Sequence, residues 1–216
     1  MNFAGAAIAA AESHLAGRDP VLAGLVARYG PCTLVSRRRP TGGHFEALAS
    51  SIAYQQLAGR AAEVIWGRVR ALVPGDFTAP QVVALEPGAL RSAGLSEAKA
   101  RSVADLAARV TSGALDLDHV ASLDDEEVVA QLSQVRGIGR WTAQMFLLFR
   151  LGRLDVWPTG DLGVRRGYAL AYGLDAPPPA AAMEGLGEPF RPWRSVVAWY
   201  CWRAADLGVS DLPTGR

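Results

Sequence analysis

Apolar residues recur every three or four positions along most of this 216-residue chain, and no stretch alternates apolar and polar residues for long. The first pattern is typical of amphipathic helices, whereas a half-buried strand requires alternation. Glycine- and proline-rich turns separate the segments, and Ser122 with Asp125 predicts a capping box at one helix start. We therefore predict an all-α protein with helices over residues 4–15, 21–29, 45–54, 58–72, 97–110, 124–132, 140–151, 162–171, 180–187 and 193–205.

Composition and charge exclude several classes of protein. Half of the residues are apolar, which supports a packed core and excludes a disordered chain. The net charge of +1 is too small to attract nucleic acid over the whole surface. Residues 133–167 nevertheless contain six arginines and only two aspartates. That segment is either a local basic binding surface or an ordinary solvated helix face, and the same alternatives apply to the arginine run at 37–39.

The cysteines and histidines offer no site for a metal. Cys32 and Cys201 are too far apart in the sequence to hold an iron–sulfur cluster, and the three histidines lack the spacing of a zinc site. Two isolated cysteines favour reduced thiols over a disulfide. No apolar run has membrane-spanning length, and the alanine-rich start lacks the basic region of a signal peptide. We expect a soluble cytoplasmic protein.

The segment Gly137-Ile138-Gly139 predicts a tight hairpin directly ahead of a helix that begins near Arg140. Glycine reaches backbone conformations that other residues avoid, and it lets another backbone approach closely. N–H groups at a helix start attract phosphate, and the carbonyls of Val135 and Ile138 could hold a monovalent cation, Na⁺ or K⁺. A helix corner with a glycine C-cap is the alternative. The arginines, tryptophan and threonine around the hairpin favour DNA as its ligand.

A single carboxylate, Asp161, follows Pro158 and Gly160 at the start of another predicted helix. Helix capping alone could account for an aspartate at this place. A carboxylate there could also assist cleavage of an N-glycosidic bond, because departure of the base leaves positive charge on the deoxyribose. The carboxylate would stabilise that charge and orient the attacking water. Asp155 is the rival acid, and we rank it as structural.

Two blocks resemble the helix-hairpin-helix (HhH-GPD) DNA glycosylase superfamily: Gly-Ile-Gly-Arg-Trp-Thr-Ala at 137–143 and Asp-Leu-Gly-Val-Arg-Arg at 161–166. Within it, the DNA-3-methyladenine glycosylase II (AlkA-like) branch is the most similar. Segments 51–62, 90–99 and 191–195 also match the patterns of this branch, and the blocks occur in the family order. The resemblance covers nearly the whole chain from about Asp19 onward.

The resemblance implies a two-lobed helical fold with a cleft between the lobes. Residues 42–155 would form a central lobe that carries the helix-hairpin-helix, and residues 1–41 with 156–216 would form the other lobe. Asp161 would lie at the mouth of the cleft. The chain has no room for the N-terminal β-lobe of some relatives, so it would be a minimal form.

The resemblance also implies roles for individual residues. Asp161 would be the catalytic carboxylate. The damaged nucleotide would swing out of a bent duplex, and Gln56, or as second choice Leu57, would fill the gap. A polar residue at a helix end is the alternative for Gln56. The complete set of expected DNA-binding residues is Gly137, Ile138, Gly139, Arg140, Thr142, Gln56, Leu57 and Arg165.

Aromatic residues are the candidates for the base pocket, because an alkylated purine is cationic and aromatic faces attract such rings. Core packing is the alternative for each of them. One position that can be aromatic in relatives is a methionine here, which leaves the substrate range open. The expected pocket residues are Trp141, Trp193, Tyr54 and Met145. Three further tryptophans fit helix-core spacing and receive no chemical role: Trp66, Trp199 and Trp202.

Relatives that also cut the DNA strand carry a lysine directly after the hairpin, where it forms a Schiff base. Trp141 occupies that position in this chain. The only lysine, Lys99, lies in a different block, and we interpret it as a surface or phosphate-contacting residue. A lyase activity is therefore not expected.

Together these observations predict a monofunctional DNA glycosylase of base excision repair that hydrolyses the N-glycosidic bond of alkylated purines such as 3-methyladenine. We expect a monomer that binds damaged double-stranded DNA at the bacterial nucleoid and requires no cofactor. A non-catalytic helix-hairpin-helix DNA-binding protein and a glycosylase for another damaged or mismatched base are the alternatives. The sequence leaves open whether 7-methylguanine, 1-methyladenine or ethenoadenine is also a substrate.

Overall fold

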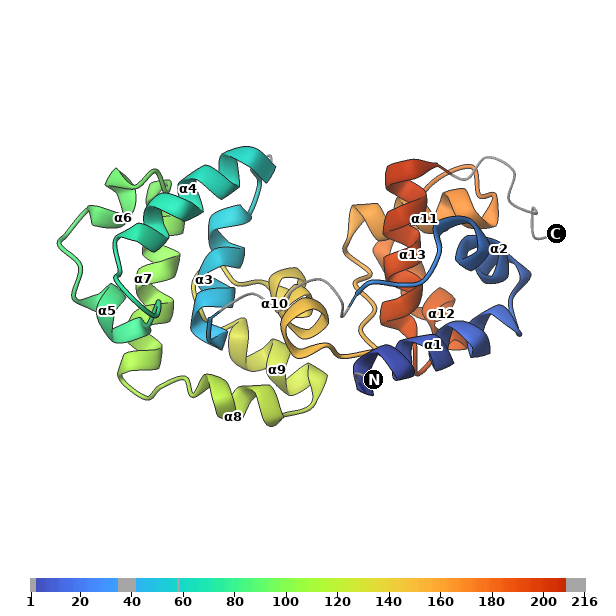
Figure 1. Cartoon of the computed structure of the whole chain (residues 1–216), viewed down its shortest axis with the longest axis horizontal. Coiled ribbons are helices and arrows are strands. Elements are labelled where there is room, and N and C mark those ends of the chain that lie inside the picture. Colours follow the sequence, from blue (N-terminus) through green and yellow to red (C-terminus); the bar gives the residue numbers. More distant parts are fainter. Residues whose placement is uncertain (1–2, 35–41, 58, 209–216) are drawn as a thin grey trace. The chain divides into compact units, whose positions relative to one another are not determined.

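The structure, a computed structural model, describes residues 3–34, 42–57 and 59–208, so the arginine run at 37–39 lies outside the described residues. Within these ranges the chain forms helices and no strand (Figure 1), which confirms the all-α prediction. None of the described helices has the length and apolar character needed to cross a membrane. The chain divides into two compact units: unit 1 comprises Met1–Arg39 and Leu151–Arg216, and unit 2 comprises Pro40–Arg150.

Unit 2 carries the long helices that the apolar spacing predicts, and their ends differ from the predicted ones by at most one residue when η1 is counted with α10. Three helices of four to six residues were not predicted, because a single helical turn shows no recurring period. The last predicted helix begins as an α-helix and continues as a π-helical segment. The elements are α3 (His44–Tyr54), α4 (Gly59–Ala71), α5 (Ala79–Val83), α6 (Ala89–Ser92), α7 (Glu97–Thr111), α8 (Leu117–Ser122), α9 (Asp125–Leu132), α10 (Arg140–Phe146) and η1 (Leu147–Leu151).

The core of unit 2 forms where α7 packs against α3 and α5. Val103 and Leu106 of α7 and Ile52 of α3 are fully buried. Burial of one such side chain stabilises a fold by about 1.5–3 kcal/mol. This packing matters for function, because α7 and the turn after α3 also hold residues that contact the hairpin.

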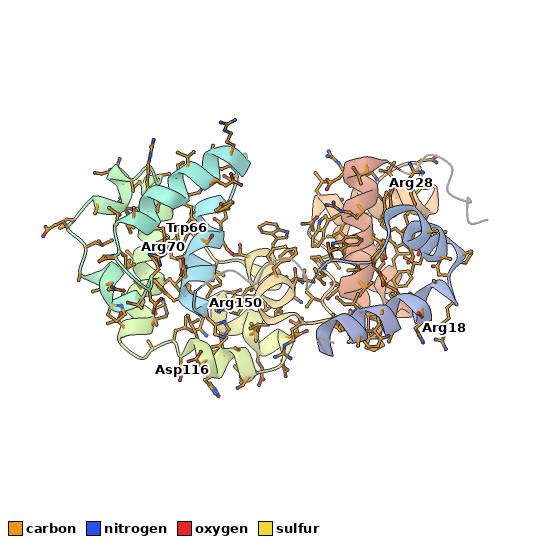
Figure 2. The ribbon with its side chains drawn as sticks, viewed as in Figure 1. Arg18, Arg28, Trp66, Arg70, Asp116 and Arg150 are labelled. Atoms are coloured by element: carbon orange, nitrogen blue, oxygen red, sulfur yellow. The ribbon has the colours of Figure 1, made fainter. Side chains whose placement is uncertain are left out.

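Trp66 belongs to an aromatic cluster of unit 2. Its ring meets the edge of Phe77 with the ring centroids 5.2 Å apart, and Phe77 stacks on Phe45 at 5.7 Å. Arg70 lies one turn after Trp66 on α4 (Figure 2), and its guanidinium donates to Glu46 at 3.0 Å. The Trp66 ring therefore packs within this unit, as its helix-core spacing predicts.

Unit 1 is organised around the C-terminal helix α13, which packs against α11 and α2. Val196 and Val197 are fully buried, and Trp199 is 6% exposed, so Trp199 is a core residue. The Tyr200 hydroxyl donates to Glu12 at 2.5 Å, which ties α13 to α1. The elements of unit 1 are α1 (Phe3–Ala16), α2 (Pro20–Tyr29), α11 (Leu162–Tyr172), α12 (Ala180–Gly187), η2 (Glu188–Phe190) and α13 (Arg194–Leu207).

Helices α11 and α13 pack side by side (Figure 1), and their backbones come close together at Gly167. A Cβ atom at this position would lie 1.8 Å from the carbonyl oxygen of Cys201, far inside van der Waals contact. Only glycine lets the two helices approach this closely. The crossing brings the first turn of α11 next to the last turns of α13.

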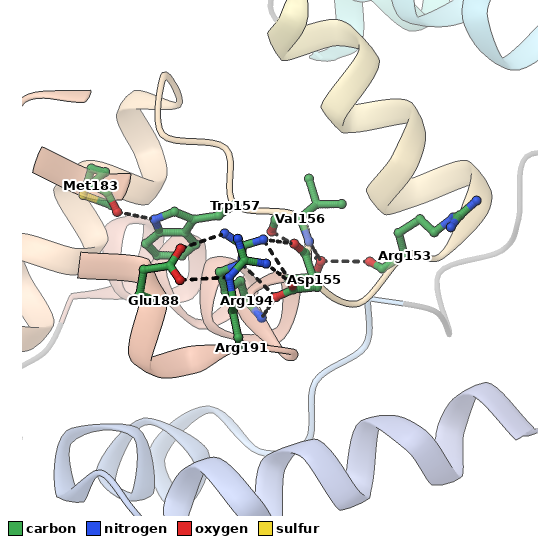
Figure 3. A network of polar contacts seen from close by, with 9 residues as sticks. Arg153, Asp155, Val156, Trp157, Met183, Glu188, Arg191 and Arg194 are labelled. Atoms are coloured by element: carbon green, nitrogen blue, oxygen red, sulfur yellow. Dashed lines mark hydrogen bonds and ion pairs between the residues drawn. The ribbon is translucent and has the colours of Figure 1, made fainter. Parts of the chain in front are cut away.

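The segment that leads into α11 is held by a network of charges around Asp155 (Figure 3). Arg194 donates to the Asp155 carboxylate at 2.8 Å, and Arg191 donates to it at 2.6 Å. The hydroxyl of buried Ser195 accepts the Val156 N–H at 2.9 Å and donates to the carbonyl of Arg153 at 2.8 Å. Asp155 therefore has the structural role that we expected.

The capping box lies elsewhere than predicted. The Asp124 side chain accepts the N–H of Glu127 at 2.9 Å, and the Glu127 side chain accepts the N–H of Asp124. Ser122 instead ends α8, and its hydroxyl donates to the carbonyl of His119. The prediction was wrong because the short helix α8 extends as far as Ser122, so the N-cap of the next helix is Asp124, two residues further along.

Candidate active site and nucleic-acid interface

Asp161 is the N-cap of α11, in extended backbone conformation. Its Oδ1 atom accepts the main-chain N–H of Val164 at 2.9 Å, which is the capping geometry predicted from the sequence. The same oxygen accepts the indole N–H of Trp202, also at 2.9 Å. Two donors from different helices therefore fix this half-buried carboxylate.

Trp202 reaches Asp161 because Gly163 leaves room for it. A Cβ atom at Gly163 would lie 2.9 Å from the Trp202 ring and 3.1 Å from Oδ1 of Asp161. Sequence reasoning treated Trp202 only as a core residue, and its contact with Asp161 was missed. Gly163 and Gly167, four residues apart on the helix after Asp161, are the signal that could have indicated a close helix partner.

The thiol of Cys201 lies beside this carboxylate and remains protonated. Its burial, and to a lesser degree the charge of Asp161, raise the pKa of Cys201 well above its ordinary value. A protonated buried thiol is not a nucleophile. Cys201 therefore offers no nucleophile beside the candidate carboxylate.

Two other residues expected at the site also lie in unit 1. Arg165, in the first turn of α11, donates its Nε–H to the Pro178 carbonyl at 2.6 Å and so holds the loop before α12. Trp193 is the half-buried N-cap residue of α13. Arg166, the neighbour of Arg165, is exposed.

In unit 2, the segment between α9 and α10 forms the predicted hairpin. Gly137 has φ of 76°, in the left-handed region that favours glycine. Ile138 is 3% exposed and anchors the turn in the core, as predicted. Helix α10 starts after Gly139 without a side-chain cap. The Val135 carbonyl, one of the two expected cation ligands, accepts the Ile138 N–H at 3.1 Å and has a second lone pair for a cation.

The residues after the hairpin differ in exposure. Arg140 forms a bidentate ion pair with Glu126 of α9, at 2.5 and 2.9 Å, and both side chains are exposed. The Trp141 ring is 45% exposed. Thr142 is buried, and its hydroxyl accepts a hydrogen bond from Gln55. A phosphate at the helix start would therefore meet the Thr142 main chain rather than its hydroxyl.

The turn after α3 presents the two residues expected to enter the duplex. Gln56 is exposed and has φ of 54°, which is unusual for a residue other than glycine. Leu57 is 38% exposed. Gln55 is half-buried, and its side-chain amide donates to the Gly137 carbonyl at 2.9 Å. The two glutamines thus have different surroundings, and Gln56 is the more exposed of the two.

Residues 49–192 match the family model described as "HhH-GPD superfamily base excision DNA repair protein". The chain belongs to the HhH-GPD superfamily. The matched region of this HhH-GPD protein includes the turn after α3, the hairpin and Asp161.

Individual relatives agree with this membership. The HhH-GPD chain is 33% identical to DNA-3-methyladenine glycosylase 1 of Schizosaccharomyces pombe, over 94% of this chain and 90% of the relative. Its fold is similar to the solved 3-methyladenine DNA glycosylase of that yeast in complex with abasic DNA, with a TM-score of 0.80, 32% identity, and coverage of 91% of this chain and 97% of that one. It is also similar to the DNA-3-methyladenine glycosidase of Bacillus halodurans, with a TM-score of 0.71, 33% identity, and coverage of 88% and 91%.

The expected pocket residues of this HhH-GPD protein fall into separate groups. Tyr54 and Met145 line one cavity of about 190 Å³ in unit 2, together with Phe146 and Phe149. Trp141 does not line that cavity, and Trp193 belongs to unit 1. Tyr54 is 37% exposed, so its ring is accessible at the cavity wall.

Proposed function

We propose that this protein is a DNA glycosylase of base excision repair that hydrolyses the N-glycosidic bond of alkylated purines of the 3-methyladenine type. The products are the free base and an abasic site in the duplex. The names of the relatives support this substrate class. The observation that carries the proposal is Asp161, held at the start of α11 by the Val164 N–H and the Trp202 indole.

The chemistry requires little beyond a well-placed negative charge. An alkylated purine is already cationic, so the electrons of the breaking C–N bond neutralise the leaving base. Positive charge then develops on the deoxyribose, where the Asp161 carboxylate stabilises it. The carboxylate also orients a water molecule, whose oxygen bonds to the sugar carbon as its proton passes to the carboxylate and from there to solvent.

DNA binding falls mainly to unit 2 in this proposal, with one contact from Arg165 of unit 1. The N–H groups at the start of α10 bind a backbone phosphate, and Gly137 and Gly139 let the strand approach closely. Such contacts position the duplex without reading its sequence. Gln56, or Leu57 beside it, enters the base stack as the damaged nucleotide leaves it. In this proposal Arg165 contacts the DNA backbone through its Nη–H groups, because its Nε–H donates to the Pro178 carbonyl.

Selectivity for damaged bases has two sources in this proposal. A damaged base is flipped at a lower free-energy cost than a normal one. Aromatic rings such as those of Trp141 and Tyr54 then attract the cationic purine. Trp141 also stands where strand-cutting relatives carry a lysine, so we propose that the enzyme leaves the DNA strand uncut.

Release of free base from methylated duplex DNA tests the function directly. Chromatography should detect 3-methyladenine in the supernatant together with an equal amount of abasic sites and no strand breaks. Defined single lesions in otherwise identical oligonucleotides would then establish the substrate range. Tight DNA binding without any base release would instead support the non-catalytic alternative.

Trp202→Phe should lower kcat about tenfold and leave KM nearly unchanged. Phenylalanine fills most of the ring space but cannot donate to Asp161, and a hydrogen bond to a charged group contributes about 1.5–3 kcal/mol. The interaction orients the carboxylate rather than binding the substrate, so the loss should appear in kcat. Steady-state base release measures both constants, and Trp66→Phe in unit 2 is the matched control. A raised KM with normal kcat would contradict the prediction.

Gly137→Ala should weaken binding to damaged and undamaged duplex alike, by about tenfold. A side chain at this left-handed position costs about 1–2 kcal/mol. The added Cβ would also lie 2.3 Å from the Ser102 hydroxyl. Gly113→Ala is the control, because Gly113 has φ of 77° but open space around it. Titration at one fixed salt concentration measures the dissociation constants. Equal effects of the two substitutions would show that the hairpin is not part of the DNA-binding site.

A further inference from the structure

Lys99, the chain's only lysine, caps the helix that precedes the Gln56 turn. Its ammonium donates to the carbonyls of Ala53 at 2.9 Å and Gln55 at 2.6 Å. Carbonyls at a helix C-terminus have no partner within the helix and carry partial negative charge, so a cation is favourable there. The contact is long-range in sequence, since Lys99 lies on α7.

Gln55 bonds both to Lys99 and to the hairpin. While its carbonyl accepts from Lys99, its side-chain amide donates to the Gly137 carbonyl at 2.9 Å and to the Thr142 hydroxyl at 3.2 Å. One residue thus connects the turn after α3 with the start of α10. The residue that follows it is the exposed Gln56.

The same stripe of α7 contacts the hairpin a second time. Ser102, one turn after Lys99, lies directly against Gly137. Asp105, one further turn along, accepts the main-chain N–H of Arg136 at 2.8 Å. Residues three apart lie on one side of a helix. This side of α7 therefore fixes the Gln56 turn at Lys99 and the hairpin at Ser102 and Asp105.

We infer that Lys99 is a positioning residue that sets the Gln56 turn at a fixed distance from the phosphate-binding hairpin, and so helps hold the damaged nucleotide out of the duplex. The inference rests on the proposed function and deepens it. A turn anchored in this way can hold Gln56 or Leu57 in the base stack while the hairpin holds the strand. Without the ammonium, the turn would lose its bonds to α7 and keep the bonds of the Gln55 side chain to the hairpin.

A purely structural role and a role in base flipping make different predictions. Base flipping costs the most for a paired base and the least for an unpaired one. The loss of Lys99 should therefore matter only where the base must be displaced from a pair. General destabilisation of the fold would affect both kinds of substrate to the same extent.

The test compares Lys99→Met with wild type on 3-methyladenine in a paired duplex and in the same oligonucleotide as a single strand. We expect kcat/KM on the paired substrate to fall about tenfold and that on the single strand to change less than about twofold. Arg101→Met removes an exposed cation of the same helix and is the control. Its ratio of paired to single-strand activity should equal that of wild type.

The remaining outcomes are distinct. Unchanged activity of Lys99→Met on the duplex, or an equal loss on both substrates, would overturn the inference. If wild type releases no base from either substrate, the proposed function itself fails. If Lys99→Met does not fold, Gln55→Met removes the neighbouring contacts and must show the same duplex-selective loss. A loss by Gln55→Met that is equal on both substrates would overturn the inference as well.

Discussion

Asp161→Asn should reduce the rate of base release about 100- to 1,000-fold while the fold remains intact. Asparagine is as good an N-cap residue as aspartate, and its oxygen can still accept the hydrogen bonds of Val164 and Trp202. The substitution therefore removes the negative charge and retains the local geometry. Single-turnover base release from a defined 3-methyladenine duplex measures the effect, and urea unfolding should show a loss of no more than about 1–2 kcal/mol, because the bond from Trp202 becomes a neutral one.

The matched control is Asp116→Asn. Asp116 is the N-cap of α8 and accepts the N–H groups of Asp118 and His119, each at 3.0 Å. It has no proposed contact with DNA, so both activity and stability should stay near wild type. Full turnover by Asp161→Asn would show that the carboxylate has no role in base release.

Gly167→Ala should destabilise unit 1 by several kcal/mol. The new methyl group would lie 1.8 Å from the Cys201 oxygen and 2.4 Å from its carbonyl carbon, and backbone atoms cannot rotate aside. Overpacking a well-filled core with flexible neighbours costs about 1–3 kcal/mol, so a backbone clash should exceed that range. Asp161 and Trp202 lie on the two helices that would be forced apart, so base release should fall as well.

Urea unfolding of Gly167→Ala measures this effect. Gly185→Ala is the control, because Gly185 also lies in a helix of unit 1 but has open space around it. That substitution should leave stability unchanged or raise it by about 0.5–1 kcal/mol. An unchanged urea midpoint for Gly167→Ala would show that the helix crossing tolerates a side chain.

The long helices were predictable because each has an apolar side that repeats with the helical period. The first helix of unit 2, for example, buries Leu48 and Ile52, four residues apart. The short helix α8 was not predictable, and this omission displaced the capping box from Asp124 to Ser122. The error arose because local patterns identify a cap only when the neighbouring elements are known.

The candidate site shows the same limit. The N-cap position of Asp161 and the burial of Ile138 followed from neighbouring residues, and both predictions are confirmed. The bond from Trp202 to Asp161 joins residues 41 positions apart, and the bond from Lys99 to Gln55 joins residues 44 positions apart. Contacts of this kind depend on how helices pack, which the spacing of apolar residues alone does not determine.

The engagement of Lys99 has a practical consequence for labelling and immobilisation. Reagents and sensor surfaces that couple through primary amines can reach only this side chain and the α-amino group. Coupling at Lys99 would replace its bonds to the Ala53 and Gln55 carbonyls and so alter the property being measured. Both native cysteines are buried, so a thiol introduced by Arg101→Cys offers a safer handle for dyes and tethers.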